Sequence, residues 1–391
     1  MAFADFIAPF DARSFCSDYF GKRPVHMPAN AGRHVDVLDW PRFNRALALA
    51  PYWNEETLKV YYKSRAALRE NYCDLSDAKP GLPAPINPAK VKSLLGLGAS
   101  LIANQIHKVC PEIARITGIL EEQFAARVWA NVYCSFKGVQ AFQTHFDLHD
   151  VFAYQAEGEK TWRVYEARAD APIAPLPPGD EVEKWLQSSR GRLLFEVKMR
   201  PGDILYLPRG QYHDALTGAS ASLHVTFGVA PANGLALFKL LESILTPESQ
   251  FRAYLPDARE ETALRQSLVQ LAERVRTVML SPAFGLDVRA MQARLARSTT
   301  DYGLPEQPAP SWFSLAKPAR LLRNDRGYFV SCESGEFPLA DAHIALEWVL
   351  GQRLFSLEDA LAQQGGLDRA TFLVELQKLI DRGIVVPTDM R

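Results

Sequence analysis

The residues best suited to chemistry stand close together in the segment QTHFDLHD, which contains His145 and Asp147. In a β-strand, residues i and i+2 point to the same face, roughly 6.5–7 Å apart, so this imidazole and carboxylate can reach one ion. A third ligand must come from a distant strand. His213, which follows YLPRGQY, stands where a barrel would return to the same end. Two histidines and one carboxylate leave coordination positions open, as in non-haem Fe(II) oxygenases.

Two other histidines compete with these ligands. His149 shares the face of His145 on an ideal strand. His224 is less favoured than His213 as the third ligand, because it lies within a predicted strand whereas His213 follows a turn. Three protein ligands and a water also describe catalytic zinc, so the ligand types leave a zinc hydrolase open. A pocket for a co-substrate must decide between the two metals.

Strand-like segments dominate the part of the chain that carries these ligands. Between Arg127 and Pro231, short β-branched and aromatic runs are separated by turn residues: RVWANVY, VFAYQ, TWRVYEA, RLLFEVKM, DILYLP and SLHVTFGV. Most of these runs have no helical pattern between them, which predicts an antiparallel barrel or sandwich.

Helical patterns flank the strands on both sides. A helix is predicted through Trp40, Phe43 and Leu47 with Asp36 as its cap, and another over residues 106–124, which Pro111 and Gly118 are expected to interrupt. Residues 234–300 contain an apolar stripe at helical spacing: Leu264, Leu268, Leu271, Val275 and Val278. This stretch is predicted to form a small helical domain.

A Pro-rich linker begins at Leu304 and leads into the C-terminal region. This region contains a strand-like GYFVSC, helical patterns near 340–350, 357–364 and 369–382, and a final strand-like GIVVP. Ser356 with Asp359 predicts a capping box, and Gly383 should end the last helix. Helices followed by a short hairpin resemble a winged-helix module.

Composition limits the classes of function. Of 391 residues, 48% are hydrophobic and 23% charged, with a formal net charge of −1, which is typical of a soluble globular protein. Near-neutral charge argues against bulk attraction to nucleic acid or membranes. No apolar run is long enough to span a bilayer, and the N-terminus lacks the pattern of a signal peptide. Five widely spaced cysteines without a CxxC pair favour a reducing compartment, so we expect a cytoplasmic protein.

The central motifs carry a family likeness. The segment NVYCSFKGVQAFQTHFDLHDVFAYQAEGEKTWRVY, with PGDILYLPRGQYHDA and SLHVTFG, resembles the JmjC ribosomal oxygenases and their bacterial cupin-4 relatives. The likeness extends upstream through Tyr19–Met27 and Gly98–Phe124. It implies an α+β fold: a double-stranded β-helix (cupin/JmjC jelly-roll) barrel, a helical dimerisation region and a winged-helix-like C-terminal domain. The expected domains are 1–233, 234–303 and 304–391.

The resemblance also implies site residues. Fe(II) would be bound by His145, Asp147 and His213, with 2-oxoglutarate and O2 as co-substrates. Lys160, 15 positions after His145, would bind the distal carboxylate of 2-oxoglutarate. From the residues alone, a solvated lysine at the turn after Gly158 is the favoured interpretation of Lys160; the resemblance reverses this preference. Further candidates for the co-substrate pocket are Asn131 and Tyr133, on one face of their strand, and Thr226. Asn131 and Tyr133 could instead be satisfied polar groups of the core.

The activity implied is hydroxylation of a protein side chain, with a histidine or arginine of a ribosomal protein as the expected target and a homodimer as the expected assembly. An oxygenase acting on a small molecule or a natural-product peptide is the first alternative. A regulator that binds nucleic acid through the winged helix is the second. From Glu306 to Arg391 there are nine basic and twelve acidic residues, which disfavours a DNA-reading module, so no nucleic-acid partner is expected.

Overall fold

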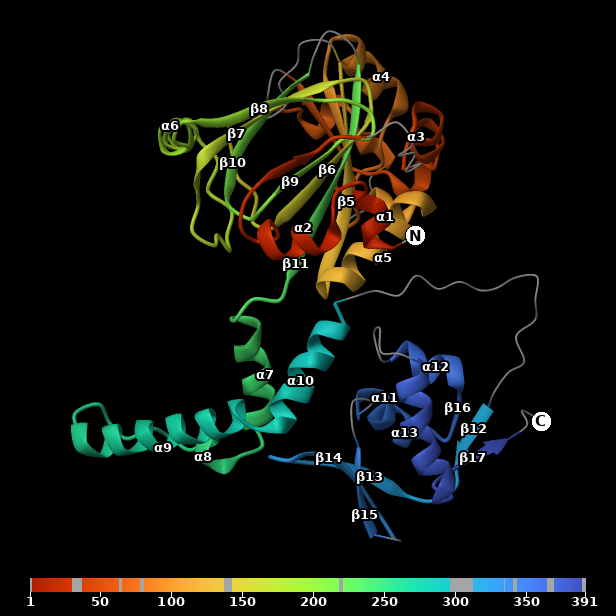
Figure 1. The fold of residues 1–391 in the computed structure, drawn as a ribbon, viewed down its shortest axis with the longest axis vertical. Coiled ribbons are helices and arrows are strands. Elements are labelled where there is room, and N and C mark those ends of the chain that lie inside the picture. Colours follow the sequence, from red (N-terminus) through yellow and green to blue (C-terminus); the bar gives the residue numbers. More distant parts are fainter. Residues whose placement is uncertain are drawn as a thin grey trace. The chain divides into compact units, whose positions relative to one another are not determined.

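Figure 1 shows the computed structural model, which describes residues 2–29, 37–62, 65–77, 81–136, 143–217, 221–295, 312–333, 335–339, 343–363 and 369–388. The chain divides into two compact units, Met1–Ala230 and Pro231–Arg391.

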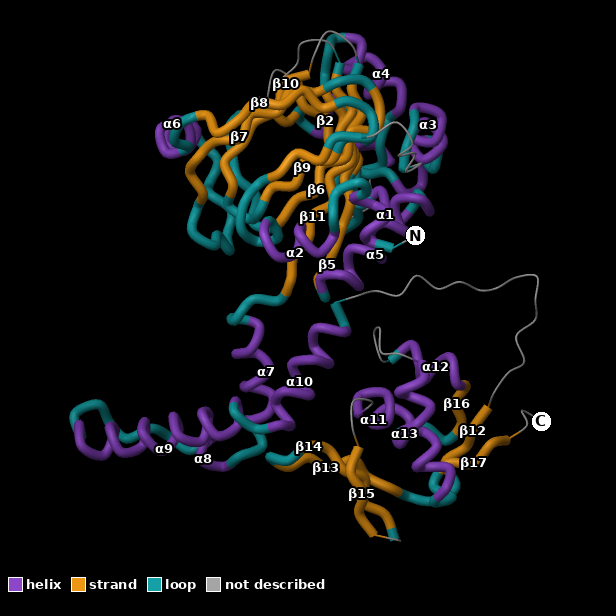
Figure 2. Tube along the Cα trace, viewed as in Figure 1, coloured by secondary structure: helices purple, strands orange, loops and turns teal. Residues whose placement is uncertain are grey.

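Two sheets face each other across the interior of the first unit (Figure 2). The larger sheet has eight strands in the order β1 (Val25–Met27), β9 (Ile204–Leu207), β6 (Asp150–Glu157), β11 (Ser222–Pro231), β5 (Ala126–Ser135), β4 (Ser100–Ala103), β2 (Leu58–Tyr62) and β3 (Arg65–Ala66). The smaller sheet has three antiparallel strands in the order β10 (Gln211–Thr217), β7 (Lys160–Arg168) and β8 (Leu193–Met199). All six predicted strand segments are confirmed.

Helices cover the outer face of the larger sheet and connect its strands. They are α1 (Phe3–Ile7), α2 (Ala12–Asp18), α3 (Trp40–Leu47), α4 (Pro88–Gly96) and α5 (Pro111–Phe124), with short 3-10 turns at Ala50–Tyr52, Arg69–Asn71, Leu75–Asp77 and Ile106–Lys108. Helix α6 (Asp180–Ser189) lies beside the smaller sheet, between β7 and β8 in the chain. Phe3 and Phe15 pack on Phe152 of β6, at centroid distances of 6.2 and 5.4 Å. Because side chains alternate along a strand, the preceding residue, Val151, faces the interior.

Three local features differ from the sequence expectations. Helix α3 is capped by Asp39, whose side chain accepts from the backbone N–H of Arg42; the proposed cap, Asp36, lies outside the described residues. The helix predicted over residues 106–124 is divided before Pro111, as expected, into a 3-10 turn at Ile106–Lys108 and α5, but α5 runs unbroken through Gly118. Helix α6, strand β10 and the short strands β1–β4 were not predicted.

The second unit contains the predicted helical segment, built from α7 (Ala236–Leu245), α8 (Ser249–Arg252), α9 (Glu261–Met279) and α10 (Pro282–Ala293). Its remaining helices are α11 (His343–Leu350), α12 (Leu357–Ala362) and α13 (Arg369–Asp381). Two three-stranded sheets complete it, with the orders β16 (Leu354–Ser356), β12 (Trp312–Leu315), β17 (Val385–Thr388) and β13 (Ala319–Asn324), β14 (Gly327–Cys332), β15 (Gly335–Leu339).

Local signals in this unit are confirmed, whereas its division into domains stays a prediction. Ser356 and Asp359 form the capping box of α12, and Gly383, at φ +63°, follows α13. Asp287 of α10 accepts hydrogen bonds from Arg323 and Tyr328, so the helical segment contacts the β13–β14 hairpin. The Pro-rich linker at 304–311 lies outside the described residues. Across the described ranges, no helix combines the length and apolarity needed to cross a bilayer.

Candidate metal and co-substrate site

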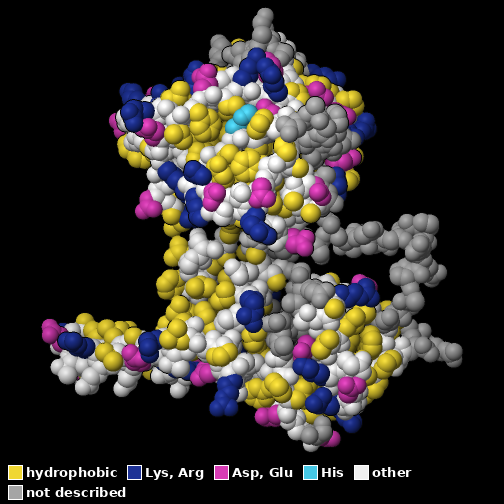
Figure 3. Space-filling view, viewed as in Figure 1, with side chains coloured by type: hydrophobic (Ala, Val, Ile, Leu, Met, Phe, Trp, Pro, Cys, Tyr) yellow, Lys and Arg dark blue, Asp and Glu magenta, His cyan; other side chains and the backbone are white. Residues whose placement is uncertain are grey.

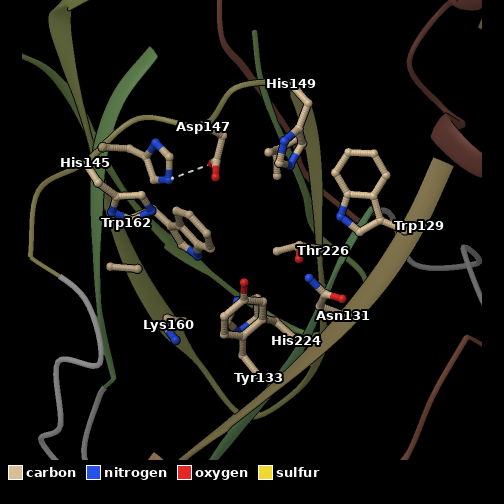
Figure 4. Close-up of a pocket in the computed structure, with 13 residues that line it drawn as sticks. Trp129, Asn131, Tyr133, His145, Asp147, His149, Lys160, Trp162, His224 and Thr226 are labelled. Carbon is tan, nitrogen blue, oxygen red and sulfur yellow. Dashed lines mark ion pairs between the residues drawn. The ribbon is translucent and has the colours of Figure 1, made fainter. Parts of the chain in front are cut away.

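His145, Asp147 and His213 come together at one end of the interior of the first unit (Figure 4). One potential ligand atom from each residue lies within 4.8 Å of the other two. The Nε2 atom of His213 is 3.5 Å from Oδ2 of Asp147, and the two imidazole centroids are 4.4 Å apart. Three ligand atoms at these separations can converge on a single ion.

Backbone pairing, and not strand alternation, brings these side chains together. His145 and His213 form an isolated antiparallel bridge, with N–H···O distances of 3.0 and 2.9 Å in the two directions. Asp147 lies in the irregular segment that follows, where its carbonyl accepts from the N–H of Gly210 at 2.9 Å. The expectation that His145 and Asp147 share a regular strand is therefore wrong. His213 is also inside strand β10 and does not merely follow a turn.

Hydrogen bonds orient both imidazoles toward the ion position. Nδ1 of His145 is 2.9 Å from the carbonyl oxygen of Gln143, and Nδ1 of His213 is 2.9 Å from that of Gln211. A carbonyl can only accept, so each Nδ1 donates and each Nε2 keeps its lone pair. In metal sites, a hydrogen bond from the ring nitrogen that does not bind the metal fixes the tautomer and the ring orientation of the histidine.

The charge states of the three groups suit a divalent cation. Burial, helped by the neighbouring His145, lowers the pKa of His213 to about 4. Burial by itself would raise the pKa of Asp147, but the imidazoles of His213, His145 and His149 outweigh this effect and lower it. At neutral pH His213 is thus unprotonated and Asp147 ionised, so a metal need not displace a proton from either. This donor set fits Fe(II).

The triad opens into a cavity of about 200 Å3 between the two sheets. Its walls contain every residue proposed for the site from the sequence, together with both rival histidines. The lining residues are Trp129, Asn131, Tyr133, His145, Asp147, His149, Val151, Lys160, Trp162, His213, Ala215, His224 and Thr226.

Lys160 is buried in this cavity, with 4% of its surface exposed. It begins strand β7 and lies away from Asp147, toward the other end of the cavity (Figure 4). Among the described residues its ammonium group has no carboxylate within ion-pair distance and makes no hydrogen bond. Burial lowers the pKa of Lys160 to about 8, against a small opposing effect of Cys134. A buried cation without a counter-ion is costly. The cavity therefore fits an anionic ligand, and Lys160 is not the solvated turn residue considered above.

Two further polar atoms of the wall lack hydrogen-bond partners within the described part of the chain: Nδ1 of His224 and Nε1 of Trp162. His224 stacks on Tyr133 at 4.8 Å and meets the edge of Trp162 at 5.5 Å. Burial, and then the charge of Lys160, lower the pKa of His224 well below its usual value. His224 is thus a neutral wall residue outside the group of three ligand atoms.

His149 packs at the edge of the cavity against Trp129, with a centroid distance of 4.5 Å. Both rings lie close to Gly228, where an added Cβ atom would be 2.6 Å from Trp129 and 2.8 Å from His149. A glycine is needed at position 228 because any side chain there would collide with the two rings.

Several cavity residues escaped the sequence analysis, although a signal for them existed. Trp129 precedes Asn131 and Tyr133 by two and four positions, and Trp162 follows Lys160 by two, so strand alternation places them on the same faces. Asn131 and Tyr133 are partly satisfied within the protein. Oδ1 of Asn131 accepts from the N–H of Gln105 at 3.0 Å. Tyr133 makes side-chain hydrogen bonds with Thr226 and Asn131, which partly oppose the burial that raises its pKa to about 12.

Replacing Asp147 with asparagine should weaken metal binding while leaving the fold intact. The substitution keeps the shape of the side chain and removes the only negative charge of the triad. We expect the affinity for Co(II) or Mn(II), measured by calorimetric titration, to fall by more than the roughly 10–100-fold typical of an outer-shell change. His149→Gln serves as the matched control and should retain wild-type affinity. Equal losses in both variants would show that the ligands have been assigned wrongly.

Comparison with known proteins is consistent with this site. Residues 102–237 match the family model described as JmjC domain. Ribosomal oxygenase 2 from Bos taurus is 29% identical over 253 residues, which cover 64% of this chain and 51% of that protein. The bifunctional lysine-specific demethylase and histidyl-hydroxylase NO66 from Drosophila willistoni is 30% identical over 184 residues, which cover 44% of this chain and 23% of that protein. The structure of YcfD, a ribosomal oxygenase from Escherichia coli, is 17% identical, covers 97% of this chain and 99% of that one, and has a TM-score of 0.49.

The aligned regions span only part of these relatives, between about a quarter and a half of their length. The JmjC match nevertheless covers β5–β11, and with them every residue of the cavity. Residues 102–237 thus match the JmjC domain model, and the chain is similar in sequence to ribosomal oxygenases over part of their length.

Proposed function

We propose that this protein is an Fe(II)- and 2-oxoglutarate-dependent oxygenase that hydroxylates a protein side chain, with a histidine or arginine of a ribosomal protein as its target. One observation carries the proposal: the two-histidine, one-carboxylate triad lines the same cavity as a buried lysine that has no counter-ion among the described residues. A metal ligand set with open positions and a fixed cation are the two parts that chelation of a 2-oxo dicarboxylate requires.

Each part of the cavity has a distinct task in this proposal. His145, Asp147 and His213 hold the iron, and Lys160 holds the distal carboxylate of 2-oxoglutarate. Tyr133, Thr226 and Asn131 provide polar contacts along the wall between these two ends. When bound, the iron supplies the O2 chemistry that converts 2-oxoglutarate to succinate and CO2 and hydroxylates the substrate. The protein contributes binding, orientation and exclusion of water, the last through the rings of Trp129 and Trp162.

The alternative of a zinc hydrolase explains less of the cavity. It needs the triad and a water molecule but has no use for Lys160. Leaving an ammonium group buried without a counter-ion costs free energy, which only an anionic ligand would offset. Trp162, whose N–H has no hydrogen-bond partner in the described ranges, lines the same space. Both features favour an enzyme that takes an anionic co-substrate.

Support for a protein substrate comes from the relatives, which are named ribosomal oxygenases and histidyl-hydroxylase. A reducing, cytoplasmic location would suit ribosomal proteins and the five free cysteines of this chain. We also propose that the winged-helix-like region 304–391 docks protein, since its net charge is negative.

Incubation with ribosomal proteins tests the function directly. With Fe(II), 2-oxoglutarate and O2, the wild-type enzyme should raise the mass of one ribosomal protein by one oxygen atom and release an equivalent amount of succinate. Asp147→Asn should do neither. Intact-mass spectrometry followed by peptide mapping would locate the modified residue. Succinate release without any mass change in a protein would instead support a small-molecule or peptide substrate.

Lys160→Ala should weaken the binding of 2-oxoglutarate to Mn(II)-loaded protein by about 30-fold or more. Truncating one partner of a buried charge pair typically costs about 2–5 kcal/mol, and each 1.4 kcal/mol corresponds to about tenfold in affinity. Affinity for the metal should change little, because Lys160 is not a ligand. Calorimetric titration measures both quantities, and unchanged affinity for 2-oxoglutarate would remove Lys160 from the binding site.

The pH dependence sharpens this test. The pKa of Lys160 in the free protein is about 8, so the ammonium form is present below that pH and lost above it. Affinity for 2-oxoglutarate should therefore fall as the pH rises from about 7 to about 9. Lys160→Arg, if it binds at all, should not show this decline, because arginine stays charged throughout the range.

We further propose that the segment α7–α10 forms a homodimer interface. Several large apolar side chains of this segment are exposed, and hydrophobic side chains gather over α7 and α10 (Figure 3). They include Leu235, Phe238, Leu268, Val269 and Leu280. Apolar surfaces of this kind are typical of interfaces that are buried in stable dimers.

Light scattering should then give a solution mass near twice the 43.7 kDa of the chain. Phe238→Glu should lower the measured mass toward that of one chain, because it places a charge in the proposed interface. Leu68→Glu is the matched control, since Leu68 is equally exposed but lies in the first unit. A wild-type protein that remains monomeric at about 10 µM would refute the interface.

A further inference from the structure

A buried polar cluster lies behind the metal ligands, on the side of the small sheet away from the cavity. Thr144 precedes His145 and Asp214 follows His213, and these two neighbours are 1% and 3% exposed. The hydroxyl of Thr144 donates to Oδ2 of Asp214 at 2.9 Å. This hydrogen bond joins the two chain segments that carry the histidines, directly beside their backbone bridge.

Three more side chains complete the cluster. The hydroxyl of Tyr165 donates to the same oxygen of Asp214 at 2.6 Å. The Nη1 atom of Arg190 donates to Thr144 at 2.9 Å and to Tyr165 at 2.8 Å, and it lies 3.6 Å from Asp214. Gln187 donates to Thr144 at 3.1 Å. We call Thr144, Tyr165, Gln187, Arg190 and Asp214 the rear cluster.

Helix α6 supplies the outer part of this arrangement. Gln187 belongs to the helix and Arg190 is its C-cap, while Leu186 packs against Tyr165 and Tyr212. Phe146 joins the same packing, with its ring 5.2 Å from that of Tyr212. The residues immediately before and after each histidine are therefore packed behind the small sheet, and none of these four lines the cavity.

We infer that the rear cluster and helix α6 position His145 and His213 for metal binding. This inference rests on the metal site of the proposed function. His145 stands outside any regular strand, and within the described residues the bridge to His213 provides its backbone pairing. A further connection is needed to hold the two rings at a fixed separation. Satisfied buried polar networks supply such rigidity because their geometry is directional, whereas apolar packing tolerates sliding.

The polar character of the cluster supports this role over simple packing. Apolar side chains of similar volume would fill the space behind the sheet at lower cost, because burying a carboxylate carries a large desolvation penalty. Asp214 is nonetheless buried, with one oxygen shared by Thr144 and Tyr165 and the other without a partner in the described part of the chain. Thr144, Tyr165 and Asp214 are thus positioning residues, not catalytic ones.

The test is the metal affinity of Thr144→Val, measured by titration with Co(II) and followed by the Co(II) absorption spectrum. Valine keeps the shape of threonine but cannot link Asp214 to Arg190. We expect a 10–100-fold loss of affinity, as for other outer-shell changes at metal sites, and a changed spectrum. Thr144→Ser, which restores the hydroxyl, should recover both. Thr117→Val is the matched control: Thr117 is also buried and hydrogen-bonded, but in α5.

Thr117→Val should lower the melting temperature and leave Co(II) affinity and spectrum unchanged. Wild-type affinity in Thr144→Val, or a loss that Thr144→Ser does not recover, would overturn the positioning role. If Thr144→Val does not fold, Arg190→Gln is tested in its place, because the Arg190 side chain is 31% exposed and tolerates substitution better. Arg190→Gln should also weaken Co(II) binding. Unchanged Co(II) binding in this variant would overturn the inference. Failure of the proposed function looks different: wild type and Asp147→Asn would then bind Co(II) equally or not at all.

Discussion

The backbone bridge between His145 and His213 is the contact on which the site depends. It pairs a residue of an irregular segment with a residue of strand β10 and so places two imidazoles side by side. The carbonyls of Gln143 and Gln211 then accept hydrogen bonds from the two Nδ1 atoms and so fix the tautomer of each imidazole. Asp147, two residues after His145, places its carboxylate beside Nε2 of His213.

Strand alternation then separates two environments on either side of the small sheet. One face of β7 and β10 carries Lys160, Trp162 and His213 into the cavity, and the other carries Tyr165 and Asp214 into the rear cluster. Within the described part of the chain, the cavity wall leaves Nε1 of Trp162 and Nδ1 of His224 without hydrogen-bond partners, and the rear cluster leaves one oxygen of Asp214 without a partner. Since buried polar groups are normally paired, the unsatisfied atoms around the cavity indicate where a ligand is expected.

Much of the architecture could be predicted from local patterns. Apolar alternation and turn residues identified the six strand segments, and spacing identified the helices of residues 234–300 and the capping box at Ser356. The JmjC likeness was carried by motifs that fall in the matched region. The errors were also local. Gly118 was expected to interrupt a helix that in fact continues through it, and α6 has too short an apolar stripe to stand out.

The sequence by itself determined the residue types of the site, because HxD, a later histidine and a lysine at a fixed offset are properties of the chain. Only the tertiary structure decided which histidines converge, since His145, His149, His213 and His224 all line one cavity and differ in distance, not in type. It also decided that Lys160 is buried, with no ion-pair partner among the described residues, and that the hydroxyl of Thr144 donates to Asp214. Burial and long-range hydrogen bonds depend on which strands become neighbours, and no local pattern encodes that pairing.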